Sequence, residues 1–141
     1  MITYSDSLEG ITADHLRGGF FDGWQKPPSP KTHLRILRGS YATVLAVDDV
    51  HVVGFITCIS DGVSAAYIPH LEVLPTYRGK GIGSELVQRM LERLRHLYMV
   101  DLICDIDLQS FYQRFGMRPY TAMIYRNYAA QSGAPDSTSS G

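Results

Sequence analysis

The sequence predicts a single domain of α/β (mixed α+β) class, with a central mixed sheet of six to seven strands and helices on both faces. The chain has 141 residues, of which 45% are hydrophobic, and this suffices for one domain with a buried core. Strand-like apolar segments alternate with segments whose apolar residues recur at helical spacing. Beyond the middle of the chain, one such strand enters a helix through a glycine-rich turn, which predicts a right-handed parallel crossover.

The first half of the chain is expected to contain two helices and four strands. A short strand covers residues 2–4, and Thr12 is expected to cap the start of the first helix. The proline cluster at residues 26–30 predicts a fixed turn, and a second helix begins at residue 29 or 30 and ends near Arg38. Runs rich in β-branched and aromatic residues predict the next three strands, over residues 41–47, 51–59 and 65–74.

The second half continues the alternation. Residues 84–97 carry apolar side chains at helical spacing and predict the clearest helix of the chain. The remaining expected elements are a buried strand over residues 98–104, a short helix over 108–115 stopped by Gly116, and one or two strands within 117–126. Residues 129–141 are rich in Ala, Ser and Gly, and we expect a disordered tail after a domain of residues 1–128.

The segment from Val73 to Ser84 has the composition of a phosphate-binding turn. Its three glycines occupy alternate positions, and a helix is expected to begin near Ser84. Glycine allows positive φ and a close approach to a ligand, and the amides at a helix start have no partner inside the helix. The candidate binding residues in this turn are Arg78, Gly79, Lys80, Gly81, Ile82, Gly83 and Ser84.

The spacing within this turn distinguishes the kinds of phosphate ligand. The sequence G-x-x-x-x-G-K-[ST] of a Walker loop is absent, and the glycines do not have the G-x-G-x-x-G spacing of a dinucleotide fingerprint. The pattern Arg78-x-x-Gly81-x-Gly83 instead resembles the acetyl-CoA diphosphate loop of the GNAT superfamily of N-acetyltransferases. The sequence of residues 111–117, Phe-Tyr-Gln-Arg-Phe-Gly-Met, is similar to that family's second signature.

This resemblance extends over residues 2–127 and implies the fold, the co-substrate and the reaction. A member of the family transfers an acetyl group from acetyl-CoA to a primary amine by direct transfer in a ternary complex. The two strands at residues 67–74 and 98–104 are expected to splay apart, with the pantetheine arm in the gap. The main chain of Leu71 and Val73 would bind that arm, and Tyr112, at the tyrosine of the second signature, would protonate the leaving thiolate.

The general base is not inherited directly from the family pattern. Many relatives carry a glutamate earlier in this strand, where this chain has Tyr67, and Asp105 stands where relatives often have asparagine. His70 and Glu72 share one strand face, so either His70 or Glu72 is a candidate base, with Glu72 alternatively orienting His70.

The acceptor side is expected near the region that joins the first two helices. Phe21 and Trp24, with neighbouring Phe20, would line the acceptor pocket or, alternatively, pack the helices onto the sheet.

Other functional classes have less support in the sequence. The net charge of −1 gives no argument for nucleic acid, no His/Cys pair has metal-ligand spacing, and no apolar run approaches 18 residues. Cys58 and Cys104 are expected to be free thiols, which suits a reducing compartment, so we expect a cytoplasmic protein. The absence of metal-ligand spacing leads us to expect no metal. The resemblance allows a homodimer, and the alternative to an enzyme is a non-catalytic acyl-CoA-binding module or sensor on the same fold.

Overall fold

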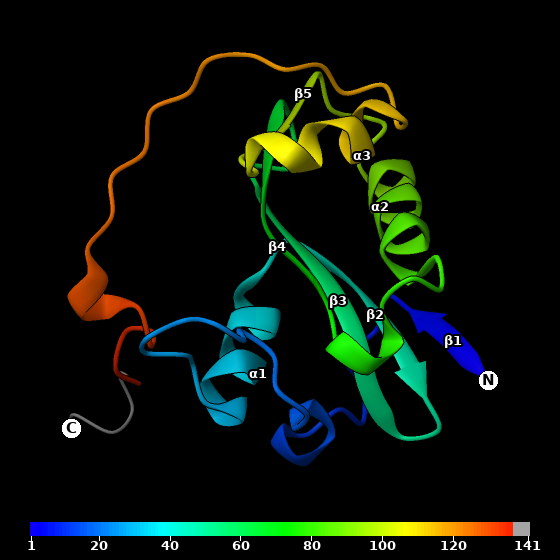
Figure 1. The fold of residues 1–141 in the computed structure, drawn as a ribbon, viewed down its shortest axis with the longest axis vertical. Coiled ribbons are helices and arrows are strands. Elements are labelled where there is room, and N and C mark those ends of the chain that lie inside the picture. The colour runs from blue at the N-terminus through cyan, green and yellow to red at the C-terminus, as the bar shows by residue number, and fades with distance from the viewer. Residues whose placement is uncertain (137–141) are drawn as a thin grey trace.

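A computed structural model describes residues 1–136 and contains one mixed sheet of five strands. The strands lie in the order β1-β2-β3-β4-β5; neighbours are antiparallel except for β4 and β5, which are parallel (Figure 1). The strand bounds are Ile2–Ser5 (β1), Ala42–Asp48 (β2), His51–Ser60 (β3), Ala65–Val73 (β4) and Met99–Leu102 (β5). The α-helices are Pro30–Gly39 (α1), Ile82–Arg93 (α2) and Gln109–Gln113 (α3), and the 3-10 helices are Ala13–Leu16 (η1), Pro75–Tyr77 (η2), Ile106–Leu108 (η3) and Tyr128–Ala130 (η4).

The two long helices cover opposite faces of the sheet (Figure 1). A Cβ added at Gly54 of β3 would lie 3.2 Å from side-chain atoms of Ile82 and of Leu86, so α2 packs closely against that face. On the other face, the ring of His33 from α1 packs at 4.3 Å from the ring of Phe55, the neighbour of Gly54. Successive residues of a strand point to opposite faces, so β3 separates two packed layers and the expectation of helices on both faces is confirmed.

Helix α2 begins two residues earlier than expected and ends four residues earlier. Gly81 adopts the left-handed conformation, with φ 81° and ψ 6°, and leads directly into Ile82. At the other end Leu94 leaves the helical conformation at φ −103°, although Leu94 and Leu97 remain buried. The apolar periodicity in the sequence therefore extends past the end of the helix, because Leu94 and Leu97 still face the core.

Strand β4 contains an irregularity and then separates from β5. Thr57 is opposite His70 but Ile59 is opposite Tyr67, so β4 has one extra residue at this point. Pro69, which has no N–H to give to a ladder, lies within the extra segment. Pairing with β5 ends at Ile68 and Leu102, whereas β4 runs on to Val73. The β4 edge beyond Ile68 is therefore open on the β5 side, as the resemblance implied.

The expectation of six to seven strands is wrong. Residues 117–126 form neither of the expected final strands, and every residue from 118 to 130 is exposed. The segment has strand-type composition, but a strand needs a partner edge, and this segment extends away from its own sheet toward the side of α1 (Figure 1). Local propensity therefore predicted an extended strand in this segment, but it could not predict whether a partner strand lies beside it.

The segment after residue 128 contacts the turn that precedes α1. The main-chain N–H of Lys26 donates a hydrogen bond of 2.8 Å to Oε1 of Gln131. The expected disordered tail covers residues 129–141, and residues 137–141 of it lie outside the described residues. None of the described helices is long and apolar enough to cross a membrane.

Candidate active site

The glycine-rich turn places unpaired amides at the start of α2. The first hydrogen bond of the helix runs from the N–H of Glu85 to the carbonyl of Gly81 at 3.1 Å, so the N–H groups of residues 82–84 precede the helical ladder. Gly79 and Gly81 have positive φ, 77° and 81° respectively, and no described atom lies within 4 Å of a Cβ built at either glycine. The turn thus combines a backbone conformation that favours glycine with open space around the two glycines and with amides that are free of the helical ladder, which suits an anionic ligand.

Gly83 differs from the other two glycines. Its φ is not positive, and it is the second residue of α2. A Cβ there would lie 3.8 Å from Phe111 and 3.9 Å from Val73, which is ordinary van der Waals contact. A small side chain would therefore fit at Gly83, and within this turn only Gly79 and Gly81 have the positive φ that favours glycine.

Three cations lie around this turn. Arg78 donates from Nε to the carbonyl oxygen of Val73 at 3.1 Å, and Lys80 lies over the ring of Tyr77. Arg114 donates from Nη2 to the hydroxyl of Ser84 at 2.7 Å, which brings a positive charge from α3 to the first turn of α2. Sequence reasoning missed Arg114, although its place within the second signature was visible.

A hydrogen bond outside the turn fixes its position. The hydroxyl of Tyr77 donates to Oδ2 of Asp48, at the end of β2, at 2.6 Å. This hydrogen bond is the main reason that the pKa of Asp48 is lowered and that the pKa of Tyr77 is raised. The turn is therefore tied to the β2–β3 hairpin as well as to its own strand and helix.

The main chain of Leu71 and Val73 faces the open edge of β4. The N–H of Leu74 bonds to the carbonyl of Val53 in β3 at 2.8 Å, so Leu74 faces β3. Backbone groups alternate between the two edges of a strand, so those of Val73 and Leu71 face the other edge. The bond that Val73 accepts from Arg78 on that side agrees with this assignment.

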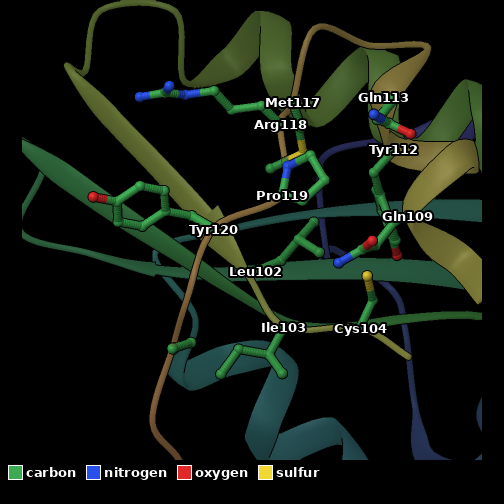
Figure 2. A pocket seen from close by; sticks show the side chains of 11 residues that line it. Leu102, Ile103, Cys104, Gln109, Tyr112, Gln113, Met117, Arg118, Pro119 and Tyr120 are labelled. Atoms are coloured by element: carbon green, nitrogen blue, oxygen red, sulfur yellow. The ribbon is translucent and has the colours of Figure 1, made fainter. Parts of the chain in front are cut away.

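Tyr112 lies on α3 beside a cavity of about 190 Å³. Figure 2 shows its side chain next to Gln109 and Cys104 on one wall, with Met117 to Tyr120 on the other. Burial, with a smaller contribution from Cys104, raises the pKa of Tyr112 to about 12. The phenol is therefore neutral over the physiological pH range and keeps a proton that it can donate.

His70 and Glu72 lie on the α1 face of the sheet, across β4 from α2. The ring of His70 is 5.7 Å from Phe21 and 6.1 Å from Trp24, and burial lowers its pKa. Glu72 accepts a hydrogen bond of 2.7 Å from the main-chain N–H of Phe21, and burial raises the pKa of its carboxyl group. Within residues 1–136 no hydrogen bond joins His70 to Glu72, and the hydrogen bond of the Glu72 carboxylate goes to the Phe21 main chain.

Phe21 and Trp24 have different environments within one aromatic cluster. Phe21 is only 2% exposed and has φ 63°, a left-handed conformation that is uncommon for a bulky residue. Trp24 is 36% exposed and packs at 4.9 Å from Phe21. Packing accounts for Phe21, whereas Trp24 presents part of its ring at the surface beside His70.

Neither cysteine takes part in a disulfide, and no metal cluster is found in the described part of the chain. Cys58 is buried and Cys104 is half-buried, and both are free thiols. No group of three or more His, Cys, Asp or Glu side chains within residues 1–136 could hold a metal ion.

Comparison with known proteins identifies the family. The sequence matches the family model of the Acetyltransferase (GNAT) family over residues 11–117, about three quarters of the chain. The chain therefore belongs to the GNAT family of acetyltransferases, whose members use acetyl-CoA as co-substrate, and the resemblance seen in the two signatures is confirmed.

Particular relatives agree with this assignment. An inferred acetyltransferase from Deinococcus radiodurans R1 is 48% identical, with a TM-score of 0.92 over 96% of this chain and 94% of that chain. A GNAT family protein from Streptococcus pneumoniae TIGR4 is 30% identical, with a TM-score of 0.73 over 90% of this chain and 98% of that chain.

Among curated proteins, an uncharacterised N-acetyltransferase, ycf52, of Pyropia yezoensis is 26% identical over 67% of this chain and 57% of its own length. The chain thus spans about half the length of the curated relatives that it matches.

Proposed function

We propose that this acetyltransferase moves an acetyl group from acetyl-CoA to a primary amine, by direct transfer while both substrates are bound. The observation that carries the proposal is the open edge of β4, which lies between the free amides of α2 at one end and the Tyr112 cavity beside β5. An amide-rich arm that ends in a thioester requires hydrogen-bonding main chain along its length, an anion site at its diphosphate and a proton donor at its sulfur.

The residues of the turn fit the diphosphate of acetyl-CoA. The N–H groups of residues 82–84 would bind its oxygens, and Gly79 and Gly81 allow the close approach. Lys80 and Arg114 would supply positive charge from two sides. Arg78, which binds the carbonyl of Val73 in this structure, would exchange that bond for a phosphate oxygen and free the carbonyl for the pantetheine arm.

The open strand edge would orient the thioester. Leu71 and Val73 expose main-chain N–H and C=O groups toward the gap that would hold the pantetheine amides. An N–H group aimed at the thioester oxygen stabilises the negative charge that develops there during transfer. Side chains have little part in this step, since the backbone supplies the groups.

The two proton transfers of the reaction would use residues on opposite faces of the sheet. His70 lies on the α1 face, and its lowered pKa keeps the ring neutral near pH 7, so that it can accept the amine proton directly or through water. Tyr112 lies on α3, which contacts α2 on the opposite face, and its neutral phenol would donate a proton to the leaving thiolate. The amine would enter beside half-exposed Trp24, and an amine with an apolar body suits that surface.

A screen of amines with acetyl-CoA tests this function by the release of free CoA thiol. The panel should contain small apolar amines, amino sugars and lysine-containing peptides, with a Tyr112→Phe variant in parallel. Thiol release that depends on the amine, and mass spectrometry showing the acetylated amine, would support the proposal. If acetyl-CoA binds and no amine of the panel releases thiol, a non-catalytic acyl-CoA-binding role becomes the better explanation.

A further inference from the structure

The loop that leads from the aromatic cluster into α1, residues 24–29, has few hydrogen bonds of its own, and we call it the proline loop. Its residues Pro27 and Pro28 have no N–H group to donate. Within residues 1–136, the only hydrogen bond made by residues 25–28 runs from the main-chain N–H of Lys26 to Oε1 of Gln131, at 2.8 Å. The loop therefore depends for this contact on a residue that lies far along the chain.

One side of the proline loop lies over a cavity. The cavity has a volume of about 270 Å³, and Pro27 and Pro28 line it together with Phe21 and His33. Because an open volume lies on this side, packing restrains the loop less than it restrains a segment that lies on a filled core. The contact with Gln131 therefore contributes much of what holds the loop in place.

A short C-terminal segment, residues 128–133, supplies this contact, and we call it the strap. It consists of η4 and the turn that follows, with backbone hydrogen bonds from Gln131 to Tyr128 at 3.2 Å and from Gly133 to Ala130 at 3.0 Å. Figure 1 shows this orange segment beside the blue proline loop and close to α1. The strap thus has a defined conformation of its own where it meets the loop.

Gly133 gives the strap a second contact, with the first turn of α1. A Cβ built at Gly133 would lie 2.6 Å from Cγ2 of Thr32, which is too close for two carbon atoms, and Gly133 has φ 102°. Thr32 is fixed in turn, because Oγ of Ser29, the N-cap of α1, donates to its hydroxyl at 3.2 Å and accepts from its N–H at 3.1 Å. A larger residue at position 133 would therefore push the strap away from α1.

The proline loop begins at Trp24, at the surface beside His70. The N–H of Trp24 donates to the carbonyl of Phe21 at 3.1 Å, and its half-exposed ring is 6.1 Å from the ring of His70. Lys26 follows two residues later, so a bond that fixes the main chain at Lys26 also limits the positions open to Trp24.

We propose that Gln131 is a positioning residue of the acceptor site: through the N–H of Lys26, the strap holds the proline loop and so fixes Trp24 where the amine enters. A loop that is already ordered loses less conformational entropy when the amine binds, so the strap strengthens that binding. The place of entry rests on the proposed function, whereas the contact between strap and loop is independent of any reaction.

The first test follows the loop without substrate. Trp24 is the only tryptophan of the chain, so its fluorescence reports on the loop alone. In Gln131→Ala, iodide should quench this fluorescence more strongly, and the amide of Lys26 should exchange its hydrogen up to about tenfold faster, the effect of one lost hydrogen bond. Gln131→Glu keeps an oxygen acceptor and should behave as the unaltered protein. Gln88→Ala is the matched control, since Gln88 is an exposed glutamine on α2, on the opposite face of the sheet.

Gly133→Val tests the strap through its second contact, with circular dichroism to show that the variant folds. It should change quenching and exchange in the same direction as Gln131→Ala does. With phenethylamine as the probe, a primary amine with an apolar body, both variants should raise KM about three- to tenfold. The affinity for acetyl-CoA and kcat should stay near those of the unaltered protein, because the strap touches neither the glycine-rich turn nor the lining of the Tyr112 cavity.

Three outcomes would overturn the proposal. The first is unchanged quenching and exchange in both folded variants, and the second is a change in Gln131→Glu as large as in Gln131→Ala. The third is an unchanged KM for phenethylamine although the loop has loosened. If the unaltered protein releases no thiol with phenethylamine, the proposed function fails for this amine, and fluorescence and exchange still decide whether the strap holds Trp24.

Discussion

Replacement of Glu72 separates a structural role of this residue from a catalytic one. Its carboxylate accepts a 2.7 Å hydrogen bond from the N–H of Phe21, which has a left-handed backbone at φ 63°. In Glu72→Ala this N–H loses a charged acceptor, and the expected cost is about 1.5–3 kcal/mol of unfolding free energy. An unfolding entropy of about 2.1 cal/mol/K per residue, over 141 residues, converts this cost into a fall in Tm of about 5–10 °C.

Glu72→Gln keeps an oxygen acceptor and removes the charge. Burial raises the pKa of Glu72, which shows that the site disfavours a charged carboxylate, so a neutral amide should lower Tm by only a few degrees, roughly the effect of 1 kcal/mol or less. We expect this variant to retain kcat near the wild-type value, because Glu72 positions the Phe21 turn. Glu72→Ala should instead raise KM for the acceptor amine.

Thermal unfolding by calorimetry and steady-state thiol release measure the two effects. Glu85→Ala is the control, since Glu85 lies in the first turn of α2 and forms a 3.7 Å surface ion pair with Arg89, whose loss should cost about 0.5 kcal/mol or less. A wild-type Tm in Glu72→Ala would refute the structural role. A wild-type Tm with a large loss of kcat in Glu72→Gln would instead assign the proton transfer to the carboxylate.

Four further predictions concern binding, turnover and pH. Gly81→Val should weaken acetyl-CoA binding at least tenfold by calorimetry and lower stability by about 1–2 kcal/mol, because a β-branched residue resists φ 81°; unchanged affinity in the folded variant would contradict the phosphate-binding turn. Tyr112→Phe should keep acetyl-CoA affinity and lower kcat on the order of a hundredfold or more in single-turnover assays; unchanged kcat with rate-limiting chemistry would remove it from the mechanism. With an acceptor of low pKa, kcat/KM should rise with pH below about 6.5, through the lowered pKa of His70, and His70→Ala should abolish this limb; a retained limb would point to another base. His33 is 1% exposed and burial lowers its pKa to about 4. The stability it confers is therefore present above pH 6.5 and is lost as the pH falls toward 4, by about 3 kcal/mol. Urea unfolding should show a smaller acid loss in His33→Phe, and an equal loss would refute this assignment.

The sequence alone determined the family, the order of elements up to α3 and the position of the glycine-rich turn. These features depend on local patterns: apolar periodicity for α2, glycines where positive φ is needed, and two short signatures in the right order. The expectation that Leu71 and Val73 act through their main chain came from the resemblance, and the alternation of backbone groups along β4 directs those groups toward its open edge.

Tertiary structure alone decided which groups meet. Local pattern does not reveal that Glu72 binds the amide of Phe21, 51 residues away, or that Arg114 reaches Ser84 across two helices. It also predicted a strand within residues 117–126 without a partner, because composition specifies an extended backbone whereas pairing depends on which edge lies nearby. The same physical reason applies to the two hydrogen bonds and to the missing strand. Hydrogen bonds and strand pairs form between residues that are far apart in sequence, and only the packed chain determines which of them lie close in space.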